Sequence, residues 1–195
     1  DLSYDITKAL LVNGTVRQEY YSDFGSAFVW KISGRAKVAG DKLTIRSSIS
    51  TGFRAPSLQQ KFYAKTNTLF VSTSGGLVPT ESGTFTNDSR PAQILGIPKL
   101  RQETSQNYSA GFTFAPIRGL DISVDAYMIR IKNRIILTNN FNGGNDAALT
   151  QLLKQSGATT ANFFTNAIDT KAKGLEAVAS YHTQFTNDNK LRISL

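Results

Sequence analysis

The chain has 195 residues and is basic, with 22 lysines and arginines against 14 acidic residues. The basic residues are spread along the chain without a run of five, which argues against a nucleic-acid-binding tail. Cysteine is absent, which excludes disulfides and thiolate metal sites, and no apolar segment approaches the roughly 18 residues of a membrane-spanning helix. Because the chain begins with aspartate, we interpret it as an internal piece of a longer protein.

Alternation of apolar and polar side chains predicts seven strands. Successive side chains of a strand point to opposite faces, so a strand with one apolar and one wet face has a two-residue period. The stretch from Leu43 to Arg54 is the clearest case, with leucine, isoleucine and phenylalanine opposite serine, threonine and arginine. The expected strands are about 8–21, 27–39, 43–54, 102–115, 120–138, 173–183 and 190–195.

Short turns and long connections alternate between these strands. Short turns are expected at Gly40–Asp41, Pro116–Gly119 and Asn187–Asn189, all at one end of the sheet. Two long segments, 55–101 and 139–170, then lie at the opposite end. Outer-membrane barrels show this asymmetry, with short periplasmic turns and long extracellular loops. Connections this long count against a compact soluble domain.

The second long segment contains one predicted helix, Ala147–Gln155. Asn145 or Asp146 can cap its first turn, and Gly157 can end it. Such a short helix is marginal in isolation, so we expect it to pack against a neighbouring loop or strand.

The expected strand at 120–138 changes phase. Its polar residues are odd-numbered from Asp121 to Asp125 and even-numbered from Arg130 onward. A β-bulge shifts the alternation of side chains by one residue. We therefore predict an irregularity within Ala126–Ile129.

Several short motifs occur in a characteristic order between residues 21 and 176. One of them, Gly52–Pro56, reads GFRAP. In order and spacing the motifs resemble the C-terminal barrel region of TonB-dependent outer-membrane receptors. The chain departs from that pattern at Arg101–Gln102, where a lysine-proline-like pair often stands. The matching segments are Tyr21–Gly25, Ser50–Leu58, Leu100–Phe112, Asp125–Tyr127, Ile131–Ile135, Asn166–Ala167 and Lys173–Glu176.

The resemblance implies an all-β fold with an antiparallel up-and-down sheet. Residues 1–195 would be a partial segment of a transmembrane β-barrel of about 22 strands, with extracellular loops at about 55–101 and 139–170. It also implies the outer membrane of a Gram-negative bacterium and uptake of a scarce nutrient: an iron chelate, a cobalamin or a glycan. The implied partners are outer-membrane lipid, the nutrient ligand and the TonB protein, which is reached through an N-terminal part. Neither that part nor a plug domain is recognisable here.

Ligand contacts are expected in the long segments, because loops carry function more often than walls. The candidate ligand-binding residues are Arg54, Phe62, Tyr63 and Phe70. Arg54 fits either an anionic ligand or a strand end held through carbonyl or carboxylate contacts. The aromatic residues, together with Phe85 and Phe141 as further loop aromatics, fit either ligand contact or packing within the loops.

No residue pattern predicts catalysis, a metal site or a cofactor, so we expect no enzyme. His182 is the only histidine, so a metal site with two histidines cannot form. A catalytic serine–histidine couple could involve only this residue, and a position on the wet face of its strand explains it better. Asp121, Ser123 and Asp125 share one strand face, and a solvated face explains them better than a metal site.

A soluble antiparallel β binding module, of carbohydrate or adhesion type, remains the alternative. A nucleic-acid binder fits less well, because it needs aromatic and basic residues on one sheet face. The barrel reading predicts apolar side chains facing lipid, and the soluble reading predicts the same side chains in one closed core. The residues that discriminate are Phe28, Trp30, Ile32, Phe112, Phe114 and Tyr181.

Overall fold

The structure is a computed structural model that describes residues 1–22, 25–40, 42–184 and 190–195. The chain divides into two compact units. Unit 1 consists of residues 1–53, 104–131 and 170–195, and unit 2 consists of residues 54–103 and 132–169.

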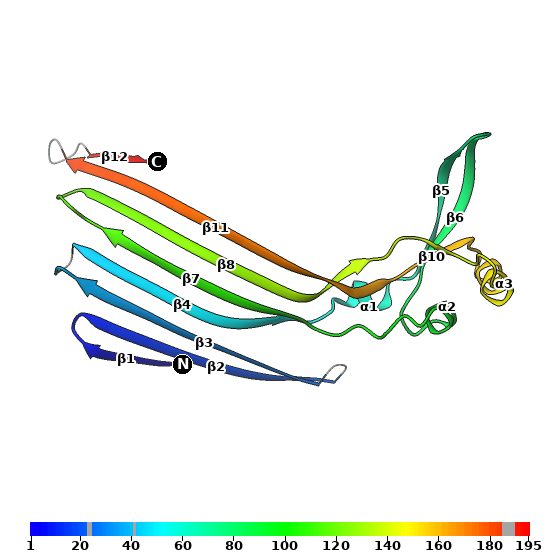
Figure 1. The fold of residues 1–195 in the computed structure, drawn as a ribbon, viewed down its shortest axis with the longest axis horizontal. Coiled ribbons are helices and arrows are strands. Elements are labelled where there is room, and N and C mark those ends of the chain that lie inside the picture. Colours follow the sequence, from blue (N-terminus) through cyan, green and yellow to red (C-terminus); the bar gives the residue numbers. More distant parts are fainter. Residues whose placement is uncertain (23–24, 41, 185–189) are drawn as a thin grey trace. The chain divides into compact units, whose positions relative to one another are not determined.

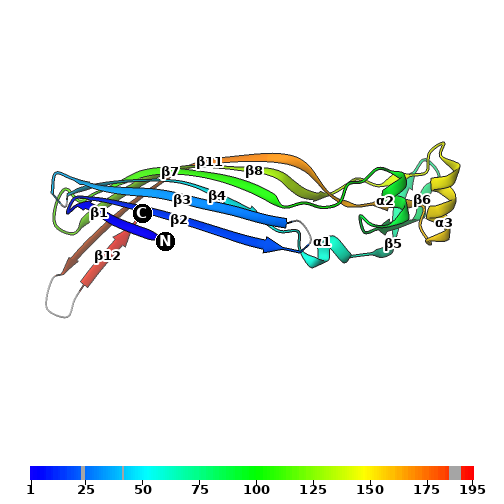
Figure 2. The ribbon, with the colours of Figure 1, turned by 90° about the horizontal axis from the view of Figure 1, so that it is seen from below.

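An antiparallel sheet of eight strands forms the larger architecture, with each strand beside its neighbour in the order β1-β2-β3-β4-β7-β8-β11-β12 (Figure 1). Figure 2 shows these strands as one layer. The sheet is open, and β1 and β12 are its edges. Its strands are β1 (Leu2–Thr7), β2 (Leu10–Tyr21), β3 (Gly25–Val38), β4 (Leu43–Arg54), β7 (Glu103–Phe114), β8 (Leu120–Leu137), β11 (Phe164–Gln184) and β12 (Lys190–Ser194).

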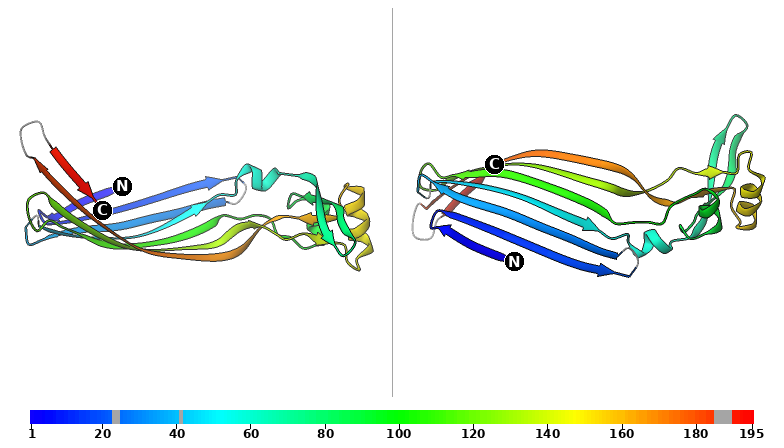
Figure 3. Two further views of the ribbon diagram at one scale, coloured as in Figure 1. Left: turned by 90° about the horizontal axis from the view of Figure 1, so that it is seen from above. Right: turned by 60° about the horizontal axis from the view of Figure 1, so that its bottom comes forward.

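The predicted turn Pro116–Gly119 lies at the same end of the sheet as the start of β4 and the end of β11, as the sequence predicts (Figure 3). The amide of Ala115, after β7, donates to the carbonyl of Lys42, before β4, at 2.7 Å. The amide of His182 in β11 donates to the carbonyl of Gly119, before β8, at 2.8 Å. Asp41 and the predicted turn at Asn187–Asn189 lie outside the described residues.

The prediction of seven strands is wrong, because the sheet contains an additional strand, β1. The sequence analysis began the first strand at residue 8, where the structure has a turn. The Thr7 hydroxyl accepts hydrogen bonds from the amides of Ala9 and Leu10, at 3.2 and 3.0 Å, and so closes that turn. Leu2 is then directly paired with Gly14 across the hairpin.

Side-chain contacts separate the polar face of unit 1 from its apolar face. The hydroxyls of Ser48 in β4 and Ser109 in β7 lie 2.8 Å apart on the polar face. Gly174 of β11 faces the same way, because a Cβ at this position would collide with the ring of Tyr127 in β8. Among the described residues of unit 1, Ala27 is the single buried hydrophobic residue. The apolar face therefore has no closed core beneath it.

The prediction of an irregularity within Ala126–Ile129 is wrong. Tyr127 stays on the polar face, in phase with the odd-numbered residues before it. Lys171 is an odd number of residues from Gly174 on β11, so its side chain lies on the face opposite Gly174 and Tyr127. Arg130 interacts electrostatically with Lys171 and therefore lies on that face too, in phase with the even-numbered residues of β8. The change of parity is compositional, because the face that is apolar early in β8 carries basic residues further along.

The backbone of β8 departs from ordinary strand geometry further along, at Asn133. This residue has a φ of 56°, a left-handed conformation in which asparagine is less strained than most residues. The strand nevertheless continues to Leu137.

Unit 2 contains a second sheet, of four strands in the order β5-β6-β10-β9. The hairpin of β5 (Lys65–Thr73) and β6 (Gly76–Thr84) falls in the segment expected to be a long loop. Its serine, threonine and glycine content hid the strand period from the sequence analysis. The remaining elements are β9 (Phe141–Asn142), β10 (Thr160–Asn162), α1 (Leu58–Phe62), α2 (Arg90–Ile94) and α3 (Ala147–Gln155).

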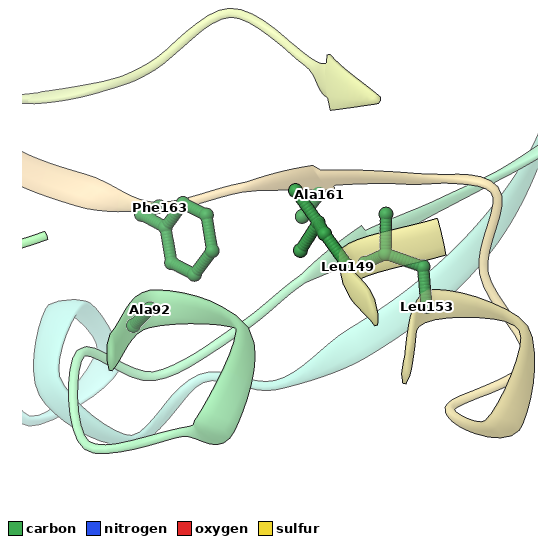
Figure 4. Close-up of a cluster of buried hydrophobic side chains, with 5 residues drawn as sticks. All are labelled: Ala92, Leu149, Leu153, Ala161 and Phe163. Atoms are coloured by element: carbon green, nitrogen blue, oxygen red, sulfur yellow. The ribbon is translucent and has the colours of Figure 1, made fainter. Parts of the chain in front are cut away.

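A small apolar core holds unit 2 together (Figure 4). Helix α3 has the predicted bounds, and the Asp146 side chain caps it by accepting from the amide of Leu149 at 3.0 Å. Leu149 and Leu153 are buried, so the helix packs against its neighbours as its length requires. The core residues are Ala92, Leu149, Leu153, Ala161 and Phe163.

Candidate ligand-binding surface

The loop aromatics divide into two groups in unit 2. Phe85 and Phe141 are structural, because their ring centroids lie 6.3 and 6.2 Å from that of the buried Phe163. At these separations aromatic pairs stabilise the interior beyond the area they bury. These two phenylalanines therefore form the loop packing that the sequence analysis left open.

Phe62, Tyr63 and Phe70 form the second group. They are 69%, 42% and 68% exposed, respectively. We call these three residues the exposed aromatic set. Large exposed apolar side chains in a loop unit are available for contact with another molecule.

A capping box fixes the helix that carries Phe62 and leads to Tyr63. The Ser57 hydroxyl accepts from the amide of Gln60 at 3.2 Å, and the Gln60 side chain accepts from the amide of Ser57 at 3.0 Å. This reciprocal pair satisfies two amides at the helix start, where a five-residue helix has few other bonds. Both aromatics are thus presented by an ordered turn of chain.

Arg54 is engaged within the protein. Its guanidinium forms a two-contact ion pair with Glu103, with Nε 3.0 Å from Oε2. Glu103 also accepts from the amide of Ile135 at 2.8 Å, and only 6% of its side chain is exposed. The three residues come from β4, β7 and β8, so one carboxylate ties three strand ends together. This favours the strand-fixing role for Arg54.

Asparagine and arginine side chains form a second clamp in unit 2, which the sequence analysis missed. Asn166 accepts from the amide of Arg101 at 2.9 Å and donates to the carbonyls of Arg101 and Asn133, at 2.8 and 2.7 Å. The Arg101 guanidinium donates to the Asn133 side chain at 2.7 Å. Asp169 accepts from the amide of Asn133 at 2.9 Å, which supports the left-handed backbone there. Asn166 and Asn133 both fall in the motifs, and their role here is to hold backbone.

The polar face of unit 1 carries its own network around Arg46. The guanidinium donates to Thr113 at 2.6 Å and to Ser123 at 2.7 Å. It also forms a two-contact ion pair with Asp125. Asp125 and Ser123 are therefore committed to Arg46, which explains them without a metal ion. Sequence analysis could not find this pairing, because Arg46 and Asp125 are 79 residues apart.

Other chemistry finds no support in the described part of the chain. There is no group of three or more histidine, cysteine, aspartate or glutamate residues placed to hold a metal ion in the described ranges. His182 is on the polar face of β11, where it pairs in register with Arg192 of β12. Within the same ranges, every helix is too short or too polar to cross a membrane.

An open antiparallel meander with one polar and one apolar face is how the wall of a membrane β-barrel is built. The sequence profile of the family described as TonB dependent receptor-like, beta-barrel, matches residues 1–194. The chain belongs to this family, whose members are outer-membrane proteins of Gram-negative bacteria. No curated protein matches the chain.

Solved structures share the fold. The siderophore receptor PirA from Pseudomonas aeruginosa aligns with a TM-score of 0.67 at 18% identity, over 99% of this chain and 32% of its own. A mutant of the ferric enterobactin receptor PfeA from the same organism gives 0.66 at 16% identity, over 98% and 24%. The RagAB peptide importer gives 0.61 at 15% identity, over 98% and 20%. The chain thus spans about a third of the length of PirA.

Proposed function

We propose that this chain is wall and loop structure of an outer-membrane receptor for TonB-dependent uptake of a scarce nutrient. Unit 1 supplies strands of the barrel wall, and segments 55–101 and 139–170 supply extracellular loops. The ligand class proposed first is an iron chelate, because PirA and PfeA are named for such ligands. A cobalamin, a glycan or, as in RagAB, a peptide are the competing ligands.

The exposed apolar face of unit 1 is the observation that carries the wall assignment. Phe28 and Ile32 are 61% and 53% exposed, and Phe112, Phe114 and Tyr181 are each about 40% exposed. A soluble sandwich would bury these side chains against a second sheet. Exposed apolar surface of this extent on a monomer marks contact with a membrane or another protein. The observation favours the barrel over the soluble binding module.

The exposed aromatic set carries the ligand assignment within unit 2. Aromatic side chains give large contact area with few rotatable bonds, and they dominate the energetics of many recognition surfaces. Phe62 and Tyr63 are held by the capping box of α1, and Phe70 lies on a paired strand. We propose that these three side chains contact the ligand, and that TonB coupling takes place through an N-terminal part.

The test is binding and uptake by the natural-length protein in outer membranes. Ferric enterobactin, cyanocobalamin, a maltodextrin and a mixed oligopeptide would be offered as labelled probes, in cells with and without TonB. We expect uptake of the iron chelate that disappears without TonB. Replacing Phe62, Tyr63 and Phe70 by alanine should weaken its binding by about tenfold or more.

The matched control is Phe28→Ala, which removes an aromatic ring of similar exposure from the apolar face of unit 1. This variant should bind the probe as the unmodified protein does. Uptake that is independent of TonB would contradict the proposed function. Equal binding by the triple variant and the control would contradict the role of the exposed aromatic set.

A further inference from the structure

Two arginines of this chain are held by carboxylates in hydrogen-bonded networks, whereas a cluster of three cations on β8 and β11 has no such partner in the described ranges. Arg46 pairs with Asp125 and Arg54 pairs with Glu103. Arg130 of β8 and Lys171 and Lys173 of β11 are all exposed and form no ion pair within the described ranges. We call these three residues the basic cluster.

The members of the cluster lie on one face of two adjacent strands. Strands β8 and β11 are neighbours in the sheet (Figure 1). Lys171 and Lys173 are two residues apart, so their side chains share a face at a spacing of about 6.6 Å. Both lysines are out of phase with Gly174, which faces Tyr127 on the polar side. The contacts of His182 with Gly119 and of Gly174 with Tyr127 set the register of β8 and β11, and the same register brings Lys171 opposite Arg130. Electrostatic repulsion of Lys171 by Lys173 and Arg130 agrees with this placement.

The basic cluster is therefore on the apolar face of unit 1. If this face contacts lipid, charged side chains are not expected on it. On β11 the residues that follow the lysines on this face are apolar as far as Tyr181: Leu175, Ala177, Ala179 and Tyr181. Asp169 precedes the lysines in the same phase, accepts from the amide of Asn133 and forms no ion pair with them in the described ranges. Leu175 is 73% exposed immediately beside Lys173. On β8 the same face carries Ile122, Val124, Ala126 and Met128 before Arg130. On both strands the apolar run gives way to cations toward the end away from the short turns.

Like charges on neighbouring positions of a sheet repel and destabilise it. A protein carboxylate does not relieve this repulsion here, so an external anion is the natural counter-charge. An anion that approaches the apolar face must come from a molecule that also has an apolar part. Basic residues at the end of a membrane-spanning apolar surface recognise anionic lipid headgroups in this way.

We propose that Arg130, Lys171 and Lys173 bind a phosphate group of an outer-leaflet lipid whose acyl chains lie against Leu175 and Met128. The inference rests on the proposed placement of unit 1 in the outer membrane and is independent of the transported ligand. The opposite end of the apolar face, near the short turns, has no equivalent cluster on β8 or β11. The site would therefore fix the height of this part of the wall relative to the lipid phosphates.

The test measures binding of lipid A to the natural-length protein in detergent micelles. Bisphosphorylated lipid A is the probe, and lipid A stripped of both phosphates is the comparison. In the test variant Arg130, Lys171 and Lys173 are all replaced by glutamine. In the matched control variant Lys31, Arg35 and Arg192, which lie on the polar face, are replaced by glutamine.

The test variant should bind bisphosphorylated lipid A about a hundredfold more weakly, from about fivefold for each charge removed. The control variant should bind bisphosphorylated lipid A as tightly as the unmodified protein does. Raising the salt concentration should weaken the binding of lipid A by each of these two proteins. A conservative variant, Lys171→Arg with Lys173→Arg, should retain binding and shows that loss is not a folding defect. Heat-modified mobility on gels would confirm that each variant is folded.

Three results would overturn the proposal. The first is that the test and control variants lose affinity for bisphosphorylated lipid A equally. The second is that the unmodified protein binds lipid A without phosphates as tightly as it binds bisphosphorylated lipid A. The third is that inorganic phosphate, at the same concentration as bisphosphorylated lipid A, displaces it from the protein. The last result would make the cluster a site for free phosphate. Failure of nutrient uptake leaves these results unaffected, so the two proposals fail separately.

Discussion

The Glu103 carboxylate makes the sharpest prediction about stability, because one buried side chain holds three strand ends. In Glu103→Ala the amide of Ile135, a residue only 6% exposed, loses its acceptor at 2.8 Å. A buried donor left unsatisfied costs about 1–3 kcal/mol. The ion pair adds about 0.2–1 kcal/mol, since the Arg54 side chain is 55% exposed and its charge is screened. The expected destabilisation, the sum of these two contributions, is about 1–4 kcal/mol.

Glu103→Gln separates the two contributions. A glutamine oxygen can still accept from the amide of Ile135, whereas the charge that pairs with Arg54 is lost. The expected destabilisation is therefore only about 1 kcal/mol. Glu81→Gln is the matched control, because Glu81 accepts one bond from Thr68 at an exposed site. It should change the free energy of unfolding by less than about 0.5 kcal/mol.

Hydrogen–deuterium exchange of the natural-length protein, read by mass spectrometry on peptides around Ile135, measures the effect. In Glu103→Ala these amides should exchange about sevenfold faster or more, since 1.4 kcal/mol corresponds to a factor of ten. The order Glu103→Ala, then Glu103→Gln, then Glu81→Gln is the diagnostic result. Equal exchange rates for the two Glu103 variants would refute the argument that the carboxylate satisfies the amide.

Three further predictions concern the same structure. Asp146→Ala removes the cap on the amide of Leu149 and should destabilise α3 by about 1 kcal/mol, seen as faster proteolysis of unit 2. Gly174→Ala places a Cβ against the ring of Tyr127 and should lower the free energy of unfolding by about 1–3 kcal/mol, measured by urea unfolding, an effect that Tyr127→Leu relieves. Phe163→Ala empties the centre of the core of unit 2 and should cost about 3–5 kcal/mol in the same unfolding assay, with intact exchange protection in unit 1.

The long, strongly alternating strands could be predicted from the sequence because their period is local. The strand Leu43–Arg54 has the expected bounds, and so does the helix Ala147–Gln155, whose cap Asp146 is adjacent in sequence. The antiparallel up-and-down sheet, as a partial segment of a barrel, is also confirmed. The hairpin Lys65–Thr84 was missed because its pairing, and not an apolar period, defines it.

The site depended on contacts that sequence spacing does not encode. On sequence alone Arg54 fits either a ligand contact or a strand end, and its contact with Glu103, 49 residues away, favours the second role. The four loop aromatics other than Tyr63 are all phenylalanines and cannot be told apart by residue type, and ring contact with Phe163 distinguishes Phe85 and Phe141 from Phe62 and Phe70. The candidate ligand-binding residues thus follow from which side chains have partners within the protein and which are exposed without such partners in the described ranges.

The central claim is that the apolar face of the sheet faces lipid and the polar face faces water. Spin labels at single cysteines test it most directly, with any other cysteine removed and the natural-length protein in bilayers. Ile32 and Ser33 are adjacent but lie on opposite faces of β3, and Phe112 and Thr113 do so on β7. Labels at 32 and 112 should collide with oxygen dissolved in lipid, and labels at 33 and 113 with a water-soluble nickel chelate. Equal access of the nickel chelate to all four positions would contradict the account.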